Sequence, residues 1–486
     1  MNIVDAIPQK AEVSILNLAA SVSFLRPTAA KFLEKVAYHY MIERNTKNFP
    51  VGVQRDKLDM LKAMISSTER GLSQGLIGKN AQHKLVEVLL GKIMLKPDDI
   101  SQQYVKKHGM NPPGFIVIAP TGRCNLKCKG CYAGSDPSRR TTMPYEIIDR
   151  IMEEKKNLWR SHFTVITGGE PFLYKDDGEN ILDLFERHSD QYFLVYTNGT
   201  LITPKVAKRL GELGNVTPAI SVEGFEKETD DRRGKGVFKL ILKAFENLRN
   251  AGVPFGISTT GFKHNAERIL DDEFIDFFFE QQGALYQWLF QYMPIGRSYT
   301  LEMMVTPEQR LSMYERTWKL VRERKLFVAD FWNSGVVSNG CISAGGGYGG
   351  GYFYIDWNGA VAPCAFNPFS VHNIKDVYAS GGDLNTVVFS SLFKDVRNWQ
   401  RKYFYDKPNC ERGNLLVPCP IRDHHREMRA IIDKVHALPI DENGAKALED
   451  HAYGEGLAEY GDKVGHISCP IWEEKYLLPE RKRMAG

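Results

Sequence analysis

The sequence predicts a mixed α/β fold, and two observations carry that prediction. Between Gly114 and about Ser298, short apolar runs alternate with helical stretches, which is typical of parallel βαβ units. The residues before about 112 and after Cys419 read as helix instead. With 486 residues, the chain is long enough for a sizeable core and two or three domains.

We expect four regions along the chain: an N-terminal helical domain at 1–112, a strand–helix unit at 113–300, a linker helix with a cysteine-containing region at 301–422, and a C-terminal helical cap at 423–486. Pro112-Pro113 marks the first boundary because prolines interrupt regular structure. Within the first region, apolar residues follow helical spacing in Ala11–Leu25, Ala29–Met41 and Lys84–Leu95. These broad apolar faces fit a helical domain packed on its neighbour, and they also fit an element that contacts a membrane surface.

The central region contains six expected strands, near 115–119, 163–167, 192–197, 217–222, 254–260 and 286–293. The expected helices between them are Tyr145–Leu158, Asn180–His188, Pro204–Leu213, Phe238–Ala251 and Asp272–Gln281. In closed parallel units, ligands gather at the C-terminal ends of the strands. The residues that directly follow each strand are therefore the candidates for a functional site.

Composition narrows the classes of function. The net charge is only +4, from 63 basic and 59 acidic residues, so there is no electrostatic case for a nucleic-acid partner. No apolar run approaches the ~18–20 residues that span a bilayer. The chain has eight cysteines and no secretory signal, which fits a reducing compartment. We expect a cytoplasmic protein, with association to a membrane surface as an alternative.

Three cysteines follow the first strand at spacings x3 and x2: Cys124, Cys128 and Cys131. Three thiolates on one loop can hold three irons of a cubic [4Fe–4S] cluster and leave the fourth iron open for a ligand. A zinc site and chance clustering are the alternatives. Zinc normally takes four closed ligands, and no histidine or fourth cysteine follows nearby.

The Cys-x3-Cys-x2-Cys pattern after a first strand resembles the signature of the radical S-adenosylmethionine (SAM) superfamily. The resemblance implies a partial (β/α)6 barrel in which the open iron binds the amino and carboxylate groups of SAM. One electron from the cluster then cleaves SAM to methionine and a 5′-deoxyadenosyl radical. The residue before the third cysteine is usually aromatic in the family, and here it is Gly130.

A second segment, Thr167-Gly168-Gly169-Glu170-Pro171, resembles the family's GGEP segment, which binds the amino group of SAM. Glycine lets the backbone approach a ligand, and Glu170 can neutralise an ammonium group. Three residues at or beyond later strand ends are candidates for contact with SAM: Asn198 by its place at the end of the third strand, and Ser221 and Arg233 by the same resemblance. An ordinary Asn-Gly turn and a solvent-facing arginine are the alternatives for Asn198 and Arg233.

A hairpin is predicted farther on, because Asp356-Trp357-Asn358-Gly359 separates two short strands. The ending Gly359-x4-Cys364 resembles the SPASM/twitch extension of radical SAM proteins, which carries auxiliary iron–sulfur clusters. The resemblance implies one auxiliary [4Fe–4S] cluster, with the ligands Cys341, Cys364, Cys419 and, as the fourth, Cys410. Buried free thiols are the alternative, above all for Cys469.

The resemblance implies an enzyme that reductively cleaves SAM and abstracts hydrogen from an unactivated C–H bond. Modification of a peptide or protein is the first expected outcome, because enzymes with a SPASM-like extension usually act on such substrates. Modification or radical C–C coupling of a lipid chain is the second, and a non-catalytic iron–sulfur electron carrier is the third. A carrier would need no SAM site. We expect a reductant such as flavodoxin or ferredoxin as a partner, and the sequence singles out no catalytic residue for the steps after hydrogen abstraction.

Overall fold

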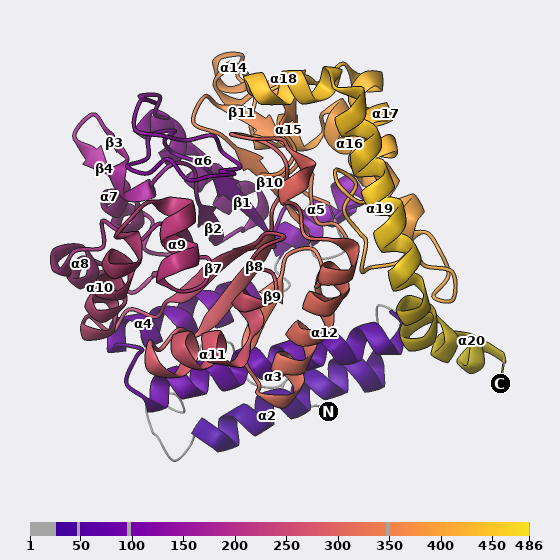
Figure 1. The fold of residues 1–486 in the computed structure, drawn as a ribbon, viewed down its shortest axis with the longest axis horizontal. Helices are drawn as coiled ribbons and strands as arrows, with labels where there is room; N and C mark the ends of the chain where they lie inside the picture. Colours follow the sequence, from indigo (N-terminus) through magenta and orange to yellow (C-terminus); the bar gives the residue numbers. More distant parts are fainter. Residues whose placement is uncertain (1–25, 46–48, 95–98, 347–349, 486) are drawn as a thin grey trace.

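The computed structural model describes residues 26–45, 49–94, 99–346 and 350–485. All six predicted strands form and pair in parallel, in chain order, at the centre of the molecule (Figure 1). They are β1 (Phe115–Ile118), β2 (Phe163–Ile166), β5 (Tyr192–Thr197), β6 (Val216–Val222), β7 (Gly256–Gly261) and β8 (Tyr286–Gln291). The predicted α/β fold with a partial barrel is confirmed.

The parallel sheet continues beyond the six predicted strands at both of its edges. Strand β9 (Phe327–Asp330) pairs in parallel with β8, and β10 (Tyr352–Ile355) pairs in parallel with β1. The predicted hairpin joins β10 to the antiparallel β11 (Ala360–Ala362), and β13 (His372–Asn373) follows at the edge. Residues 327–330 fall in the stretch that the sequence suggested was linker, and the free edge of β8 gives them a pairing partner.

Helices connect the strands, and their apolar faces complete one hydrophobic core with the sheet. Helix α8 shows how local sequence sets the ends of these helices. Thr203 accepts a hydrogen bond from the Val206 N–H, Pro204 occupies the first helical position, and Gly214 ends the helix at φ +71°. The bounds are α6 (Tyr145–Trp159), α7 (Ile181–Arg187), α8 (Pro204–Leu213), α9 (Glu226–Arg233), α10 (Val237–Asn250), α11 (Asp272–Ile275), which continues as a π-helical segment to Gln281, and α12 (Pro307–Glu323).

The N-terminal helices are α2 (Arg26–Tyr38) with a π-helical continuation to Arg44, α3 (Val51–Ser73), α4 (Lys79–Lys84) with a π-helical continuation to Met94, and α5 (Asp99–His108). Helices α2 and α3 lie along the lower edge of the molecule in Figure 1, whereas α5 lies near its middle. The helices predicted at 29–41 and 84–95 are thus confirmed in the main, whereas 11–25 lie outside the described residues. Helix α3 contacts α2, α12, β9 and α13 (Gly335–Ser338), which places it against the sheet.

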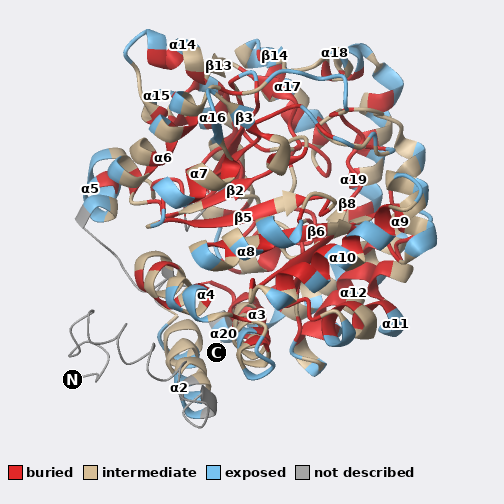
Figure 2. Ribbon diagram, turned by 90° about the vertical axis from the view of Figure 1, so that its left-hand side faces the viewer, coloured by how far each residue is buried: buried red, intermediate tan, exposed pale blue. Residues whose placement is uncertain are grey.

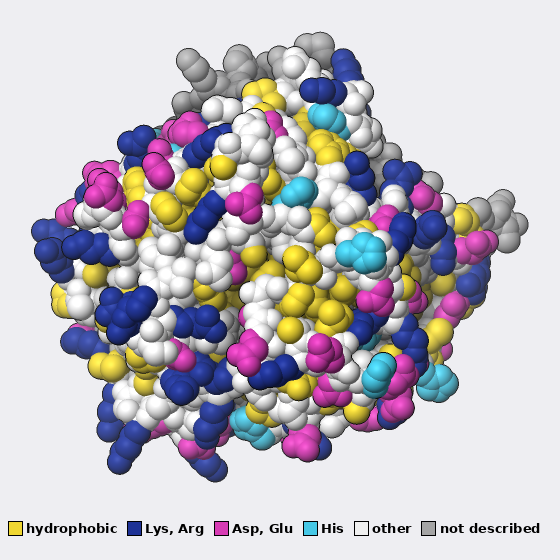
Figure 3. Space-filling view, turned by 90° about the horizontal axis from the view of Figure 1, so that it is seen from above, with side chains coloured by type: hydrophobic (Ala, Val, Ile, Leu, Met, Phe, Trp, Pro, Cys, Tyr) yellow, Lys and Arg dark blue, Asp and Glu magenta, His cyan; other side chains and the backbone are white. Residues whose placement is uncertain are grey.

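The C-terminal part of the chain is helical, as predicted. Helices α14 (Ile374–Ala379), α15 (Leu384–Val388) and α16 (Ser391–Gln400) precede the cap formed by α17 (His425–Val435), α18 (Glu442–Glu449), α19 (His451–Trp472) and α20 (Leu478–Ala485). A second core joins Val53 of α3 to Trp318 of α12 and Trp472 of α19, so an N-terminal helix packs together with a C-terminal one. Within the described ranges, no helix has the length and apolar character needed to cross a membrane. Figure 3 shows basic and acidic side chains intermixed on the upper face.

Candidate active site

The three cysteines of the first motif lie on the loop after β1 and line one cavity of about 540 Å³. Backbone hydrogen bonds hold this loop in place: the Cys124 N–H donates to the Asp136 carbonyl at 3.2 Å, and the Lys129 N–H donates to the Arg232 carbonyl at 3.0 Å. Burial raises the pKa of Cys124 to about 12, against the hydrogen bond that its sulfur accepts from the Leu126 N–H. A cationic partner such as iron is needed to keep so buried a thiolate charged. No group of three His, Cys, Asp or Glu residues in the described parts of the chain has the geometry to hold a single metal ion.

Gly130 takes the place of the aromatic residue that the family usually has before its third cysteine, and the structure explains why. Its φ is +60°, which favours glycine, and an added Cβ would lie 2.8 Å from the ring of Tyr292. Tyr292 comes from the end of β8 and stacks on Phe262 with a centroid distance of 5.1 Å. The ring of Tyr292 therefore fills the space that a side chain at position 130 would need.

The glycine pair of the second motif packs against the backbone of the cysteine loop. The Gly169 N–H donates to the Thr121 carbonyl at 2.8 Å, and the Glu170 N–H donates to the Arg123 carbonyl at 2.9 Å. A Cβ on Gly169 would lie 2.0 Å from the Arg123 oxygen, so only glycine fits there. Gly168 and Gly169 both line the cavity.

Glu170 and Pro171 are not among the residues that line the cavity. The Glu170 carboxylate is fully buried and accepts hydrogen bonds from the Thr197 hydroxyl at 2.7 Å, the Asn198 N–H at 2.9 Å and the Phe172 N–H at 3.2 Å. Burial raises the pKa of Glu170, and these three donors oppose the rise. In this arrangement Glu170 ties the end of β2 to the end of β5, which differs from the predicted contact with an ammonium group.

Asn198 is buried, lines the cavity and belongs to the network around the first cysteine. Its side-chain amide donates to Asn125 Oδ1 at 2.9 Å and lies 3.9 Å from Cys124 Sγ, while its oxygen accepts from the Thr200 N–H. Ser221, at the end of β6, also lines the cavity. Both residues therefore line the same cavity as the cysteines, and their contact with SAM stays a prediction.

Arg233 lines the same end of the cavity, with its Nη1 3.9 Å from Cys128 Sγ. It donates to Glu223 through Nε at 2.6 Å and through Nη2 at 2.7 Å, and Arg232 forms a second ion pair with the same carboxylate. Although burial opposes ionisation, these two guanidinium groups hold the pKa of Glu223 below its usual value. Two cations face one anion here, so this end of the cavity favours an added anionic group. Arg232 was not among the predicted site residues, although the Arg232-Arg233 pair was visible in the sequence.

Three cysteines of the C-terminal region, Cys341, Cys364 and Cys419, line another part of the cavity. Cys364 Sγ lies 2.9 Å from the Tyr352 hydroxyl, and Cys341 Sγ lies 3.1 Å from the Ser343 hydroxyl. Burial raises the pKa of all three thiols, and Cys341 and Cys364 are close enough to Cys419 to raise its pKa further by charge repulsion. The tertiary structure thus groups three thiols that are 23 and 55 positions apart in sequence.

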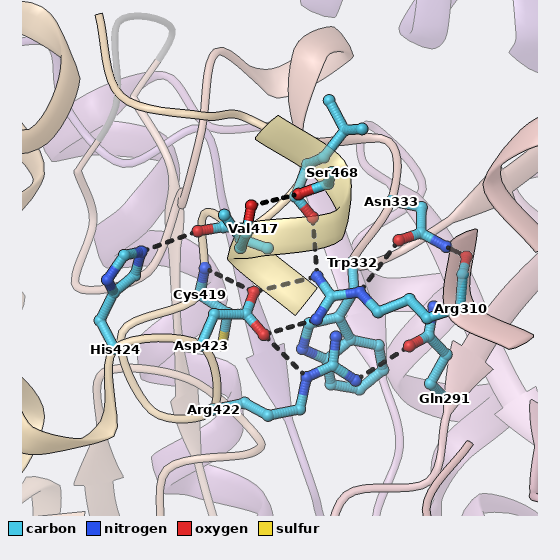
Figure 4. Close-up of polar contacts among 12 residues, drawn as sticks. Gln291, Arg310, Trp332, Asn333, Val417, Cys419, Arg422, Asp423, His424 and Ser468 are labelled. Carbon is cyan, nitrogen blue, oxygen red and sulfur yellow. Dashed lines mark hydrogen bonds and ion pairs between the residues drawn. The ribbon is translucent and has the colours of Figure 1, made fainter. Parts of the chain in front are cut away.

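A buried ionic network supports Cys419 (Figure 4). Asp423 accepts hydrogen bonds from Arg310 at 2.6 and 3.0 Å, from Arg422 at 3.2 Å and from the Cys419 N–H at 3.3 Å. Arg422 is fully buried against the ring of Trp332, and it also donates to Gln291 Oε1. Its Nη2 has no hydrogen-bond partner among the described residues. A buried guanidinium with an unused donor thus lies near the Cys419 thiol, in a network that also contains the buried Asp330 carboxyl.

Cys410 is not among the residues that line the cavity, and Cys469 is exposed on α19. The carbonyl of Cys410 accepts a hydrogen bond from Arg481, which places this residue beside the C-terminal helix. The structure therefore does not bring Cys410 to the other three thiols, in contrast to its predicted role as the fourth ligand.

Comparison with known proteins identifies the barrel. Residues 118–273 match the family model described as the radical SAM superfamily. The mycofactocin maturase MftC of Mycolicibacterium smegmatis is 29% identical over 309 residues, which cover 60% of this chain and 75% of that protein. The AdoMet-dependent heme synthase of Methanosarcina barkeri is 25% identical over 297 residues, which cover 55% of this chain and 80% of that protein. The chain is a radical SAM enzyme.

The fold of this radical SAM enzyme is similar to that of Streptococcus suis SuiB, solved with bound S-adenosylmethionine. The TM-score is 0.51 at 20% sequence identity, and the match covers 66% of this chain and 75% of SuiB. The C-terminal region is SPASM/twitch-like, as predicted, with the β10–β11 hairpin ahead of Cys364. As an enzyme, the chain is not the non-catalytic electron carrier that the sequence left as a third alternative.

The radical SAM enzyme uses a [4Fe–4S] cluster and SAM. Its residues fit both groups. The three thiols line one cavity, and the Arg233 guanidinium lies close enough to balance the negative charge of their thiolates. Gly168 and Gly169 expose their backbone to the same cavity.

Proposed function

We propose that the enzyme abstracts hydrogen from an unactivated C–H bond of a substrate held in the apolar cavity. When bound, the cluster would supply the one electron for reductive cleavage of SAM, and that cleavage would make hydrogen abstraction possible. The observation that carries the proposal is that Cys124, Cys128 and Cys131 line one end of a largely apolar cavity together with Asn198 and Arg233. The chain's contribution is to hold the reacting groups together and to exclude water.

The proposed roles follow from position. Cys124, Cys128 and Cys131 hold the catalytic cluster, and the backbone of Gly168 and Gly169 receives SAM with Asn198 and Ser221. Arg233 offers a cation to the carboxylate of SAM, with Glu223 fixing its orientation through two hydrogen bonds. Glu170 and Pro171 act through the loop rather than through contact.

We also propose an auxiliary [4Fe–4S] cluster on Cys341, Cys364 and Cys419. The unpaired Nη2 of Arg422, close to the Cys419 thiol, supports an anionic group at these thiols, because a buried donor needs a partner. Cys410 could become the fourth ligand only if its segment moved from its place beside Arg481. A flavodoxin or ferredoxin in the cytoplasm is the proposed reductant.

Two substrate classes have support. A peptide or protein substrate is favoured by the comparisons, because MftC is named a maturase and SuiB was solved with a bound precursor peptide. A lipid chain is favoured by the apolar lining of the cavity, which is described below.

The test is anaerobic reconstitution of the enzyme with iron and sulfide, followed by measurement of iron, sulfide and 5′-deoxyadenosine under reducing conditions. We expect about eight irons per chain, on the basis of four per cubic cluster. The Cys124/Cys128/Cys131→Ala triple variant should lose about four irons and all SAM cleavage, whereas the control Cys469→Ala should keep both. Unchanged cleavage in the triple variant would refute the proposed function, and about four irons in the wild type would refute the auxiliary cluster.

A further inference from the structure

The cavity extends well beyond the cysteine end of the barrel. It continues along the inside of the sheet to the N-terminal ends of the strands, where it is lined by Phe115 of β1, Phe163 of β2 and Phe327 of β9. Beyond these rings it reaches Met60 and Met64 on helix α3. The cavity therefore connects the cysteines at one end of the sheet with the N-terminal helices at the other.

The side chains along this far part are apolar. Two residues farther along each strand, alternation turns Val117, Val165 and Ala329 into the same cavity, and Leu194 of β5 joins them. Two serines of the segment at α13 also line the cavity, and the hydroxyl of one of them, Ser338, already donates to the carbonyls of Gly335 and Gly340. The far part thus offers a ligand apolar contact and few free hydrogen-bonding groups.

This chemistry distinguishes a hydrocarbon from a peptide. Each peptide unit that entered the far part would bury an N–H and a C=O group, and a buried polar group without a partner costs about 1–3 kcal/mol. A methylene group carries no such cost and gains about 0.8 kcal/mol from burial. The methionines at the far end suit a flexible chain, because methionine side chains adapt to irregular apolar shapes.

Helix α2 lies next to α3, the helix that carries Met60 and Met64, and its own described side chains are exposed or partly exposed. Helix α2 packs on α3, yet among its described side chains and those of its continuation, from 28 to 44, none is buried (Figure 2). Phe32 is 51% exposed and Tyr38 is 46% exposed, with Lys31 and Lys35 between and beside them. Exposed aromatic residues interspersed with lysines are typical of helices that lie in the membrane interface.

We propose that the cavity holds one linear hydrocarbon chain of a lipid, and that the α2–α3 pair receives this chain from a membrane surface. The inference rests on the proposed function, because the carbon of the chain that loses its hydrogen must lie at the end of the cavity lined by Cys124, Cys128 and Cys131. The polar groups of the lipid remain outside the far part of the cavity, because that part has few partners for them.

The first experiment measures binding of cis-parinaric acid, an eighteen-carbon polyene fatty acid whose fluorescence rises in apolar surroundings, to the anaerobically reconstituted full chain. We expect one probe per chain in the wild type and at least tenfold weaker binding in Val117→Phe, which fills the cavity. Ile118→Phe is the matched control, because Ile118 is the next residue of β1, is fully buried and does not line the cavity. Ala329→Leu adds less bulk to the same space and should weaken binding in the same direction, should Val117→Phe fail to fold.

The second experiment asks whether the chain comes from a membrane. Co-sedimentation with vesicles of equal parts phosphatidylcholine and phosphatidylglycerol should fall at least fivefold in Phe32→Glu/Tyr38→Glu. The control Leu240→Glu/Leu438→Glu changes exposed apolar residues elsewhere, at 51% and 70% exposure, and should sediment like the wild type. Equal loss in both double variants, or no sedimentation of the wild type, would overturn the membrane source.

The outcomes separate this inference from the proposed function, because probe binding needs no SAM cleavage. SAM cleavage without probe binding, or equal probe binding by the Val117 and Ile118 variants, would overturn the hydrocarbon site and favour a peptide substrate. Probe binding that the cavity variants abolish, without SAM cleavage, would support the site and count against the proposed function.

Discussion

Asp423→Asn tests the buried network beside Cys419 most directly. The substitution keeps the shape of the side chain and removes the charge that balances Arg310 and Arg422. The Asp423 side chain is 0% exposed and that of Arg310 is 1% exposed, so water cannot replace the lost interaction. Breaking a buried ion pair by removing one partner costs about 3–5 kcal/mol, and we expect a loss of that size in the free energy of unfolding.

The assay is urea unfolding of the reconstituted enzyme at pH 7, followed by circular dichroism. Asp462→Asn is the control, because Asp462 pairs with Arg426 at 3.0 Å with both side chains more than half exposed. An exposed pair of this kind contributes about 0–1 kcal/mol. Similar losses below about 1 kcal/mol in both variants would show that the Asp423 network does not stabilise the fold as argued.

The same residue predicts a pH dependence. Although burial opposes ionisation, Arg310 and Arg422 hold the pKa of Asp423 well below its usual value. A carboxyl whose folded-state pKa is lowered stabilises the fold above its unfolded pKa of about 3.9 and loses that contribution as the pH falls further. The difference between wild type and Asp423→Asn should therefore be complete at pH 7 and shrink below about pH 4.

Three further predictions concern the site and its surroundings. Gly169→Ala should displace the cysteine loop, because the added Cβ would clash with the Arg123 carbonyl oxygen. Iron analysis should then show a loss of about four irons per chain. The control Gly465→Ala should lose none, because no atom lies within 4 Å of its added Cβ. Arg233→Met should weaken SAM binding about tenfold or more by calorimetry, since hydrogen bonds to charged groups contribute about 1.5–3 kcal/mol, and an unchanged affinity would remove Arg233 from the SAM site. Burial raises the pKa of Asp356 to about 6, so the wild type should lose about 3 kcal/mol of stability as the pH rises from about 4 through 6. Asp356→Asn should abolish that part of the pH dependence, and identical pH profiles of the two proteins would contradict the assignment.

Local sequence was sufficient wherever a short segment carries its own signal. Hydrophobic periodicity and turn residues predict the six strands, the helices between them and the β10–β11 hairpin. These elements form near the predicted positions. The cysteine spacing and the glycine pair likewise belong to single loops, so their chemistry could be predicted without knowledge of distant contacts.

Tertiary structure decided whatever depends on residues far apart in the chain. Strand β9 pairs with β8 because β8 would otherwise leave a free sheet edge. The local sequence at 327–330 does not predict this pairing. Glu170 turns to Thr197 and the Asn198 N–H, since a buried carboxylate must satisfy its oxygens with the donors that the fold brings to it.

The same reason explains the grouping of the thiols and the reach of the cavity. Cys341, Cys364 and Cys419 meet while Cys410 does not, because only the packing of the C-terminal region sets the distances between these segments. The sequence by itself determined the chemistry at the ends of the strands. The shape of the space beside it, from the cysteines to Met60 and Met64, arises from contacts between segments that the chain order alone does not reveal.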